Sequence, residues 1–298
     1  MRLVALAAAA ALSFCSLPVL AQDDAAAARA AYEQQLATLQ FRDGAQTLAE
    51  ADAVLALDSQ FRFLAAPDAR RVLEDLWGNP PDDSVLGMVV PADVSLAADE
   101  SWAAVVTYSA EGYVSDEEAS AIDYAAMLKE MQAATQEEND ARRQQGYPTV
   151  QLVGWASPPR YDAASKKLHW AKELAFEGSD GHTVNYDVRV LGRRGFLSLN
   201  AVGNMAQLPA MQAGMQQLIP QVDFSAGERY ADFDESTDQV AAYGIAALVG
   251  GTLAAKTGLF AKLFALLIAA KKIVIPLLIG AGALVMRLFK RKSDQPAG

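Results

Sequence analysis

Cysteine and histidine are almost absent from this 298-residue chain, which has one cysteine and two histidines. The chain also lacks the G-x-S-x-G, P-loop and H-E-x-x-H patterns, which are typical of serine hydrolases, nucleotide-binding proteins and zinc proteases. The cysteine, Cys15, lies within the N-terminal 21 residues. Once those residues are removed, neither disulfides nor cysteine–metal chemistry is available, so stability depends on an ordinary hydrophobic core. We expect no bound cofactor or metal.

Residues 1–21 have the composition of a secretory signal peptide. Arg2 precedes an apolar run over residues 3–14, and Val19-Leu20-Ala21 supplies a small-residue cleavage site. Lipidation of Cys15 is the competing interpretation, but Phe14 directly before it is too bulky for a good lipoprotein site. We therefore expect an exported chain that begins at residue 22.

Residues 240–292 are rich in alanine, glycine and leucine and are expected to anchor the chain in a membrane. Within them, residues 273–289 are the clearest span, near the lower limit of about 17 residues for a spanning helix. The lysine pair 271–272 would cost roughly 2.5 to 3.5 kcal/mol per residue at mid-membrane, so the chain is expected to break or surface there. Core helices of a soluble domain would show a polar face, which this segment lacks.

Two membrane topologies are compatible with the distribution of lysines and arginines in this anchor. A single span keeps the polar tail, residues 293–298, in the cytoplasm, whereas a hairpin places the tail outside. Counting basic residues does not separate them cleanly, because residues 256–272 and 287–292 each carry four. We favour the single span, with the preceding domain on the periplasmic side of a bacterial inner membrane.

The exported residues 22–239 are strongly acidic. They carry a net charge of −19, whereas residues 240–298 carry +7. Such a charge makes nucleic-acid binding and docking on anionic lipid headgroups unfavourable. A solvated acidic surface is the simplest explanation, and a surface for divalent cations or a basic partner is the alternative.

The exported chain divides into three parts by composition. Residues 22–40 are rich in helix formers and predict a helical lead-in. Residues 41–230 alternate strand-like and helical stretches, and residues 231–239 predict an acidic juxtamembrane linker. Before residue 150, strands are expected at 53–57, 61–64, 85–90 and 102–108, and a helix is expected to start at Pro67. A second helix is expected to start at the capping box Ser115-Asp-Glu-Glu118 and to turn polar from Gln132 to Gln145.

Four further strand-like runs, at 150–156, 168–176, 183–190 and 196–202, are separated by breaks short enough for hairpins and predict an antiparallel meander. Alternation within the third run places Tyr186, Val188 and Val190 on one face and Asn185, Asp187 and Arg189 on the other. A helix with Leu208, Met211, Met215 and Leu218 on one side is expected to cover the sheet. The predicted class is α+β: an antiparallel β-meander packed with helices, followed by C-terminal hydrophobic helices.

Seven separated blocks carry a family resemblance. They are Phe61–Leu64, Leu76–Pro81, Gly87–Pro91, Gly112–Asp116, Gly154–Trp155 with Pro158–Tyr161, His169–Glu173 and Asn185–Gly195. On these blocks the chain resembles a bacterial family of membrane-anchored proteins known as domain of unknown function 2167, from about Gln34 to the C-terminal anchor. The resemblance implies a signal peptide and a C-terminal hydrophobic segment. It implies no activity and no site residues.

His169 and His182 fall on consecutive predicted strands, with Glu173, Glu177 and Asp187 nearby. A site of histidines and carboxylates for a metal or for acid–base chemistry is one interpretation. A turn near Ser179 would pair His182 with residues close to position 177 and put His169 opposite positions near 190. Two unconnected strand histidines are therefore the favoured interpretation.

Two other groups are candidates for a ligand or partner surface. Arg193 and Arg194 form the compact basic pair of the acidic domain, suited to a carboxylate or phosphate group, or simply to a hairpin tip. The tryptophans at 77, 102 and 170, together with Trp155, would suit a groove for glycan or peptide, although tryptophans on strands are usually core residues.

Asp232 to Asp238 place oxygens at alternating positions, as at the start of a calcium loop. Thr237 replaces the required glycine and Tyr243 stands where the bidentate glutamate belongs. An acidic linker is the preferred interpretation.

Two classes of function remain. The preferred one is a non-enzymatic envelope protein anchored in the lipid bilayer, whose exported domain binds a protein, peptide or glycan. The alternative is a membrane-tethered hydrolase or metal-dependent enzyme that uses His169 or His182 with nearby carboxylates.

Overall fold

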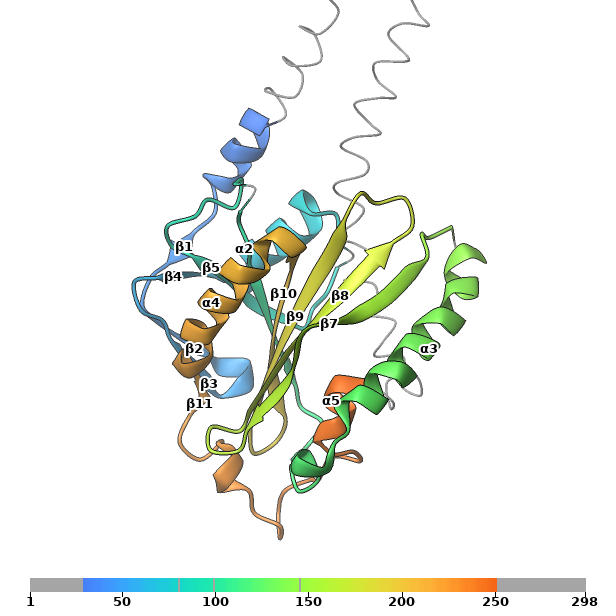
Figure 1. Ribbon diagram of the computed structural model, residues 1–298. Helices are drawn as coiled ribbons and strands as arrows, with labels where there is room; N and C mark the ends of the chain where they lie inside the picture. Colours follow the sequence, from blue (N-terminus) through green and yellow to red (C-terminus); the bar gives the residue numbers. More distant parts are fainter. Residues whose placement is uncertain (1–28, 80, 99, 145, 251–298) are drawn as a thin grey trace, which may run out of the picture.

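The computed structural model describes residues 29–250, except 80, 99 and 145 (Figure 1). The predicted signal peptide, the predicted span at 273–289 and the polar tail lie outside the described residues. Within the predicted lead-in, residues 29–36 are helical. None of the helices described between residues 29 and 250 is long and apolar enough to cross a membrane.

The elements follow in chain order. The strands are β1 (Phe41–Arg42), β2 (Ala45–Leu48), β3 (Ala53–Ala56), β4 (Phe61–Ala65), β5 (Val85–Pro91), β6 (Ala104–Ser109), β7 (Val150–Asp162), β8 (Lys167–Phe176), β9 (His182–Leu191), β10 (Phe196–Asn204) and β11 (Val222–Phe224). The α-helices are α2 (Ala66–Arg71), which continues into a π-helical turn (Val72–Leu76), α3 (Tyr124–Gln144), α4 (Leu208–Leu218) and α5 (Ile245–Gly250). Short 3-10 turns are η1 (Ala49–Ala51), η3 (Ala119–Ala121), η4 (Met205–Gln207), η5 (Ile219–Gln221) and η6 (Tyr230–Asp232).

An eight-stranded antiparallel sheet in the order β1-β4-β5-β6-β10-β9-β8-β7 organises the domain. The predicted meander is confirmed as β7 to β10, because short turns between apolar runs favour hairpins. The meander joins the N-terminal strands through β6 and β10, where Ala104 pairs with Ala201 and Ser109 with Phe196. A second sheet of three strands, β11-β3-β2, lies beside it. The α+β prediction is thus confirmed for the domain.

One face of the large sheet lies under α4 and the small sheet (Figure 1). Tyr186, Val188 and Val190 of β9 point to this side and join a cluster with Met211 and Met215 of α4. The predicted alternation is therefore confirmed, and the helix expected at Leu208 is α4. Its apolar side chains repeat at helical spacing, so they meet the sheet along one stripe.

The opposite face is covered by separate helices. The segment α2 with its π turn packs on β4 and β5 through Ala69, Val72 and Leu73. Near the other end of the sheet, α5 contributes Ile245 and Val249 to a second cluster. The first half of α3 lies against β7 and β8 in a third cluster.

The helix predicted from the capping box at Ser115 begins nine residues later, at Tyr124. Asp123 provides the N-cap, since its carboxylate accepts from the amides of Ala125 and Ala126, both at 3.0 Å. The helix starts late because residues 113–116 bond to the C-terminal part of the domain. The amide of Tyr113 donates to the carbonyl of Gln239, and the amide of Asp116 donates to the Tyr230 hydroxyl. Those contacts hold residues 113–116 out of helical conformation.

The residues predicted as linker and as the first part of the anchor are packed on the domain. Val240 forms a parallel β-bridge with Tyr113, and the amide of Ile245 donates to the carbonyl of Ser115. Gly112, with φ +99°, is needed here because a Cβ would lie 2.6 Å from the carbonyl oxygen of Gln239. We call residues 225–250 the C-terminal clasp.

Candidate functional site

The two histidines occupy separate places on the meander. His169 pairs across the sheet with Val188, and His182 with Ala175, so both registers differ by two residues from the expected ones. His182 Nδ1 lies 2.5 Å from Glu173 Oε1. This register keeps the two histidines apart, whereas it brings His182 together with Glu173. Among residues 29–250 as described, no group of three or more histidine, cysteine, aspartate and glutamate side chains could hold a metal ion.

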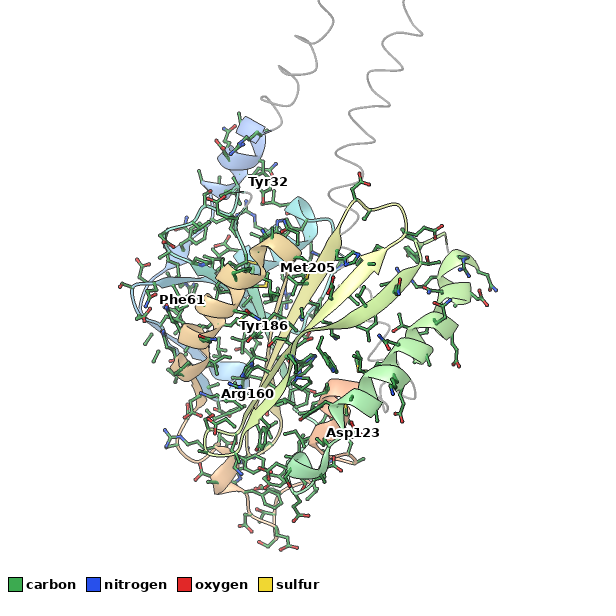
Figure 2. All side chains as sticks on the ribbon, viewed as in Figure 1. Tyr32, Phe61, Asp123, Arg160, Tyr186 and Met205 are labelled. Carbon is green, nitrogen blue, oxygen red and sulfur yellow. The ribbon has the colours of Figure 1, made fainter. Side chains whose placement is uncertain are left out.

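His169 is half-buried and its Nδ1 lies 3.1 Å from the Tyr186 hydroxyl. Tyr186 lies in the interior between α4 and the sheet (Figure 2). Burial lowers the pKa of His169, and the positive charge of Arg160 lowers it further. Burial also raises the pKa of Tyr186 to about 12. The pair is therefore a neutral imidazole and a neutral phenol at neutral pH.

The two arginines at the β9–β10 turn hold the clasp. Arg193 donates through Nε and Nη2 to the two carboxylate oxygens of Asp238, and through Nη1 to the carbonyl of Gly227. Arg194 lies 3.0 Å from Glu228. The bidentate pair lowers the pKa of Asp238. The structure thus places both arginines against clasp carboxylates.

The acidic stretch that resembled a calcium loop uses its oxygens internally. Asp234 accepts from the amide and hydroxyl of Ser236, and Asp232 accepts from the amides of Gly227 and Arg229. These bonds, together with the Arg193 contact of Asp238, stabilise turns in the clasp.

The tryptophans do not share a groove. Trp102 belongs to the core beneath α4, and Trp170 to the core beneath α5. Trp155 packs on that second core and donates through Nε1 to the Tyr124 carbonyl. Trp77 packs near α2 and donates to the Tyr32 hydroxyl. Packing in the cores explains these positions, because tryptophans on strands are usually core residues.

A buried polar row crosses the face of the meander opposite α4, and the sequence did not single it out as a site. Asp187, fully buried, lies 3.3 Å from both Lys172 Nζ and Arg189 Nη2, and its Oδ1 accepts from Asn200 at 2.9 Å. Asn185 accepts from the same Asn200 amide. The guanidinium of Arg189 also lies over the Trp170 ring. The period-two polar residues of β9 were the available signal, but alternation alone does not distinguish a buried polar face from a solvated one.

A second network joins the β7–β8 turn to the clasp. Asp116 accepts from the hydroxyls of Tyr161 and Tyr230, at 2.5 and 2.9 Å, and from Lys166 Nζ at 2.7 Å. Burial raises the pKa of Asp116, but these three hydrogen bonds outweigh it, so the pKa is lowered. The Tyr113 ring stacks on Phe233 and packs at a tilt against Tyr230. The arrangement fixes a charged carboxylate and neutral phenols, and its contacts hold the clasp in place.

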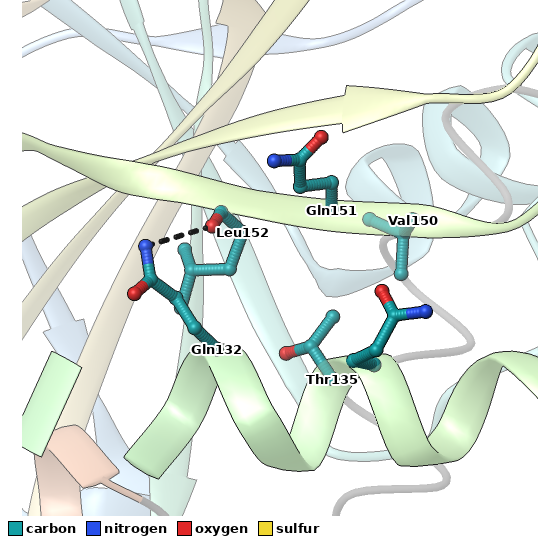
Figure 3. Close-up of a pocket in the computed structure, with 6 residues that line it drawn as sticks. Gln132, Thr135, Val150, Gln151 and Leu152 are labelled. Atoms are coloured by element: carbon teal, nitrogen blue, oxygen red, sulfur yellow. Dashed lines mark hydrogen bonds between the residues drawn. The ribbon is translucent and has the colours of Figure 1, made fainter. Parts of the chain in front are cut away.

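A groove of about 290 Å³ opens between α3 and the edge strand β7 (Figure 3). Its lining comes from three positions of each element: Gln132, Thr135, Gln136, Val150, Gln151 and Leu152. The lining contains no charged side chain, no aromatic ring and no nucleophile paired with a base. Gln132 Nε2 and the Thr135 hydroxyl donate to backbone carbonyls, and the side chain of Gln151 lies on the side of β7 away from α3 (Figure 3). The groove is therefore polar and uncharged.

The amides of α3 reach the outer edge of β7. Gln132 Nε2 donates to the carbonyls of Leu152 and Val153, at 3.2 and 3.0 Å, the first of which is drawn in Figure 3. Both carbonyls face α3 because the β7–β8 register shifts between Leu152 and Gly154. The sequence predicts a polar stretch from Gln132 to Gln145, but no pattern in it indicates that this stretch lies along a strand edge.

The fold is an α+β domain built on an antiparallel sheet, with a polar groove at the sheet's edge. The model of the family described as "Protein of unknown function (DUF2167)" matches residues 40–282, and the chain belongs to this family. The resemblance seen in the sequence is thereby confirmed.

Comparison with individual proteins adds little. No curated protein matches the sequence. The solution structure of cyanobacterial PsbP (CyanoP) from Synechocystis sp. PCC 6803 is similar at 8% sequence identity, over 63% of this chain and 94% of that chain, with a TM-score of 0.34. A similarity at that score carries no argument about function.

Proposed function

We propose that this protein is a membrane-anchored envelope protein whose exported domain is a non-enzymatic binding module on the outer face of the cytoplasmic membrane. The observation that carries the binding role is the uncharged, hydrogen-bonding groove between α3 and β7. Export and anchoring are supported by the signal-like residues 1–21 and by the apolar, basic residues 251–292 that follow the clasp.

The positions of the charged groups also support binding over catalysis. Cations hold the buried Asp187, cations and hydroxyls hold the partly buried Asp116, and Arg193 and Arg194 hold the clasp carboxylates. A general acid or base needs a reactive proton within reach of a substrate. These groups instead stabilise the fold.

Cross-linking and pull-down of the intact membrane form tests the binding role. Gln136→Trp narrows the groove from an exposed position on α3, and Gln217→Trp is the matched control on exposed α4 surface. We expect a specific partner with the wild type and the control, and a reduced yield with Gln136→Trp. Recovery of no specific partner, or equal recovery with both variants, contradicts a partner site in the groove.

Topology is tested separately with a C-terminal reporter active only in the cytoplasm. An active reporter supports the single span, whereas a silent reporter rules it out.

A further inference from the structure

The second half of α3 is held against the sheet by polar groups alone. The buried residues of this 21-residue helix are Thr135, Asn139 and Arg142. Its larger apolar side chains, among them Leu128 and Met131, lie in the first half and pack on the meander. From Gln132 to Gln144 the apolar residues are alanines. Because burial of apolar area supplies most helix docking energy, this half is the part of the helix that separates from the sheet most easily.

Asn139 makes with β7 the bonds that a neighbouring strand would make. Its Nδ2 donates to the Val150 carbonyl at 2.9 Å, and its Oδ1 accepts from the Val150 amide at 2.8 Å. A hydrogen-bonded residue pair in an antiparallel ladder exchanges two bonds in the same way. About two turns earlier on α3, Gln132 donates to the next two outward carbonyls of β7. The carboxamides of Gln132 and Asn139 therefore make hydrogen bonds to β7 that the backbone of a neighbouring strand would otherwise make.

We propose that residues 132–144 of α3 occupy the place of a ninth strand, and that an extended peptide segment of a partner protein replaces them by pairing with β7. This inference rests on the proposed binding function and names the class of partner. Addition of a strand to a sheet edge draws affinity from main-chain hydrogen bonds. The part of the lining that stays in place, Val150, Gln151 and Leu152 of β7, favours a peptide over a glycan, because it contains no aromatic ring on which a sugar could stack.

The geometry also defines how the helix controls access. Leu128 and Met131 keep the first half of α3 on the sheet while the second half separates, so the helix acts as a hinged cover. A bound strand must compete with Asn139 and Gln132 for the same backbone groups. Loss of either carboxamide should therefore strengthen peptide binding rather than weaken it, which a simple contact residue would not do.

The test uses full-length protein in detergent micelles and a phage-displayed library of random peptides of about 12 residues. Enriched peptides should show alternating side-chain patterns and bind as strands. Methylation of the backbone nitrogens that face β7 should weaken binding about tenfold or more, because each lost hydrogen bond contributes about 1 kcal/mol. Methylation of the alternate set of nitrogens should leave binding unchanged.

Protein variants supply the second arm. Gln132→Ala and Asn139→Ala should tighten binding several-fold, while Gln217→Ala on α4 should have no effect. Circular dichroism checks that each variant stays folded, and the partly buried Gln132 keeps the test open if the Asn139 variant does not fold.

Failure to enrich any peptide, equal effects of both methylation patterns, or unchanged affinity in folded Gln132→Ala would overturn strand addition. The proposed function would survive these results if the cross-linking experiment still recovers a partner that depends on the groove. The two proposals therefore fail in distinguishable ways.

Discussion

Arg193 and Asp238 lie 45 positions apart and meet in a bidentate pair, with 2.6 Å between Nε and Oδ2 and 3.1 Å between Nη2 and Oδ1. This pair joins the β9–β10 turn to the clasp, a segment that composition alone assigned to a linker. The acidic residues before the hydrophobic segment are thus part of the folded domain. Their stability is open to direct measurement.

Arg193→Ala should loosen the clasp, because it leaves Asp238 without its two charge-assisted bonds. We expect a lower melting temperature and faster proteolysis between residues 225 and 240, with Arg29→Ala at an exposed helical pair as the control. Since Arg193 lowers the pKa of Asp238 below its ordinary value of 3.8, the pair's contribution is complete above that pH. It is lost as the pH falls through the lowered pKa, so the stabilities of variant and wild type should converge in strong acid.

Asp116→Ala should reduce the free energy of unfolding by about 1 to 3 kcal/mol, since a partly buried carboxylate with three donors is removed. Its exposed neighbour Glu117 provides the matched control, for which an alanine change should stay within about 0.5 kcal/mol. Chemical denaturation followed by tyrosine fluorescence measures both. Equal effects of the two changes would contradict a structural role for the Asp116 network.

Ile245→Ala should cost about 2 to 4 kcal/mol, because Ile245 is fully buried among Leu168, Trp170 and Phe196. Val240, which is 52% exposed, is the control, and its alanine change should be nearly neutral. Thermal unfolding of the full-length protein in detergent tests the pair. A neutral Ile245→Ala would mean that residues 240–250 do not belong to the domain.

Asp187→Ala should destabilise the domain by about 3 to 5 kcal/mol, because it leaves Lys172 and Arg189 buried without a shared anion. The triple change Lys172→Met, Asp187→Leu and Arg189→Met removes all three charges and should recover most of that loss. Urea denaturation compares the two variants. A triple variant less stable than Asp187→Ala would contradict the idea that Asp187 mainly offsets the cost of burying Lys172 and Arg189.

Replacement of both histidines by alanine should preserve the fold and the binding of a partner. The pKa of His169 lies below its ordinary value of 6.5, so the unfolded chain binds a proton more readily than the folded one. Stability should therefore fall as the pH drops below about 6.5 in the wild type, and this part of the pH dependence should be weaker in His169→Gln. A folded double variant that binds its partner but does not replace the wild-type protein in cells would instead support a catalytic role for the histidines.

The meander and its helical covers could be predicted because their signals are local. The runs of β7 to β10 are separated by short breaks, and the alternation of Tyr186, Val188 and Val190 assigns one face of β9. Pairing of β6 with β10 could not be predicted in the same way, since no turn links them. Ser115 likewise shows a proper capping pattern, yet contacts with Gln239 and Tyr230 decide the conformation there.

The candidate groove was beyond sequence reasoning for a related reason. A polar stretch such as Gln132 to Gln144 usually indicates a solvated helix surface. Asn139 and Arg142 are buried because they bond backbone groups of Val150, at the start of the outer edge of β7, and of Pro148 just before it. Which strand forms an edge is known only after the sheet is assembled. Residue type alone indicated the candidate surface residues Arg193, Arg194, Trp155, His169 and His182. The groove, in contrast, depends on where its residues lie in the assembled sheet.

The central pairing of the large sheet also sets the order in which the chain must fold. Synthesis delivers β4, β5 and β6 long before β10, so Ala104 must wait for Ala201 while the meander is still being made. During that interval β6 presents an open edge that begins with the apolar run Ala104-Val-Val106, a state prone to association with other chains. Non-local pairing of this kind also slows folding. Slow folding and a tendency to associate therefore follow from the strand order, and refolding yields should fall steeply as protein concentration rises.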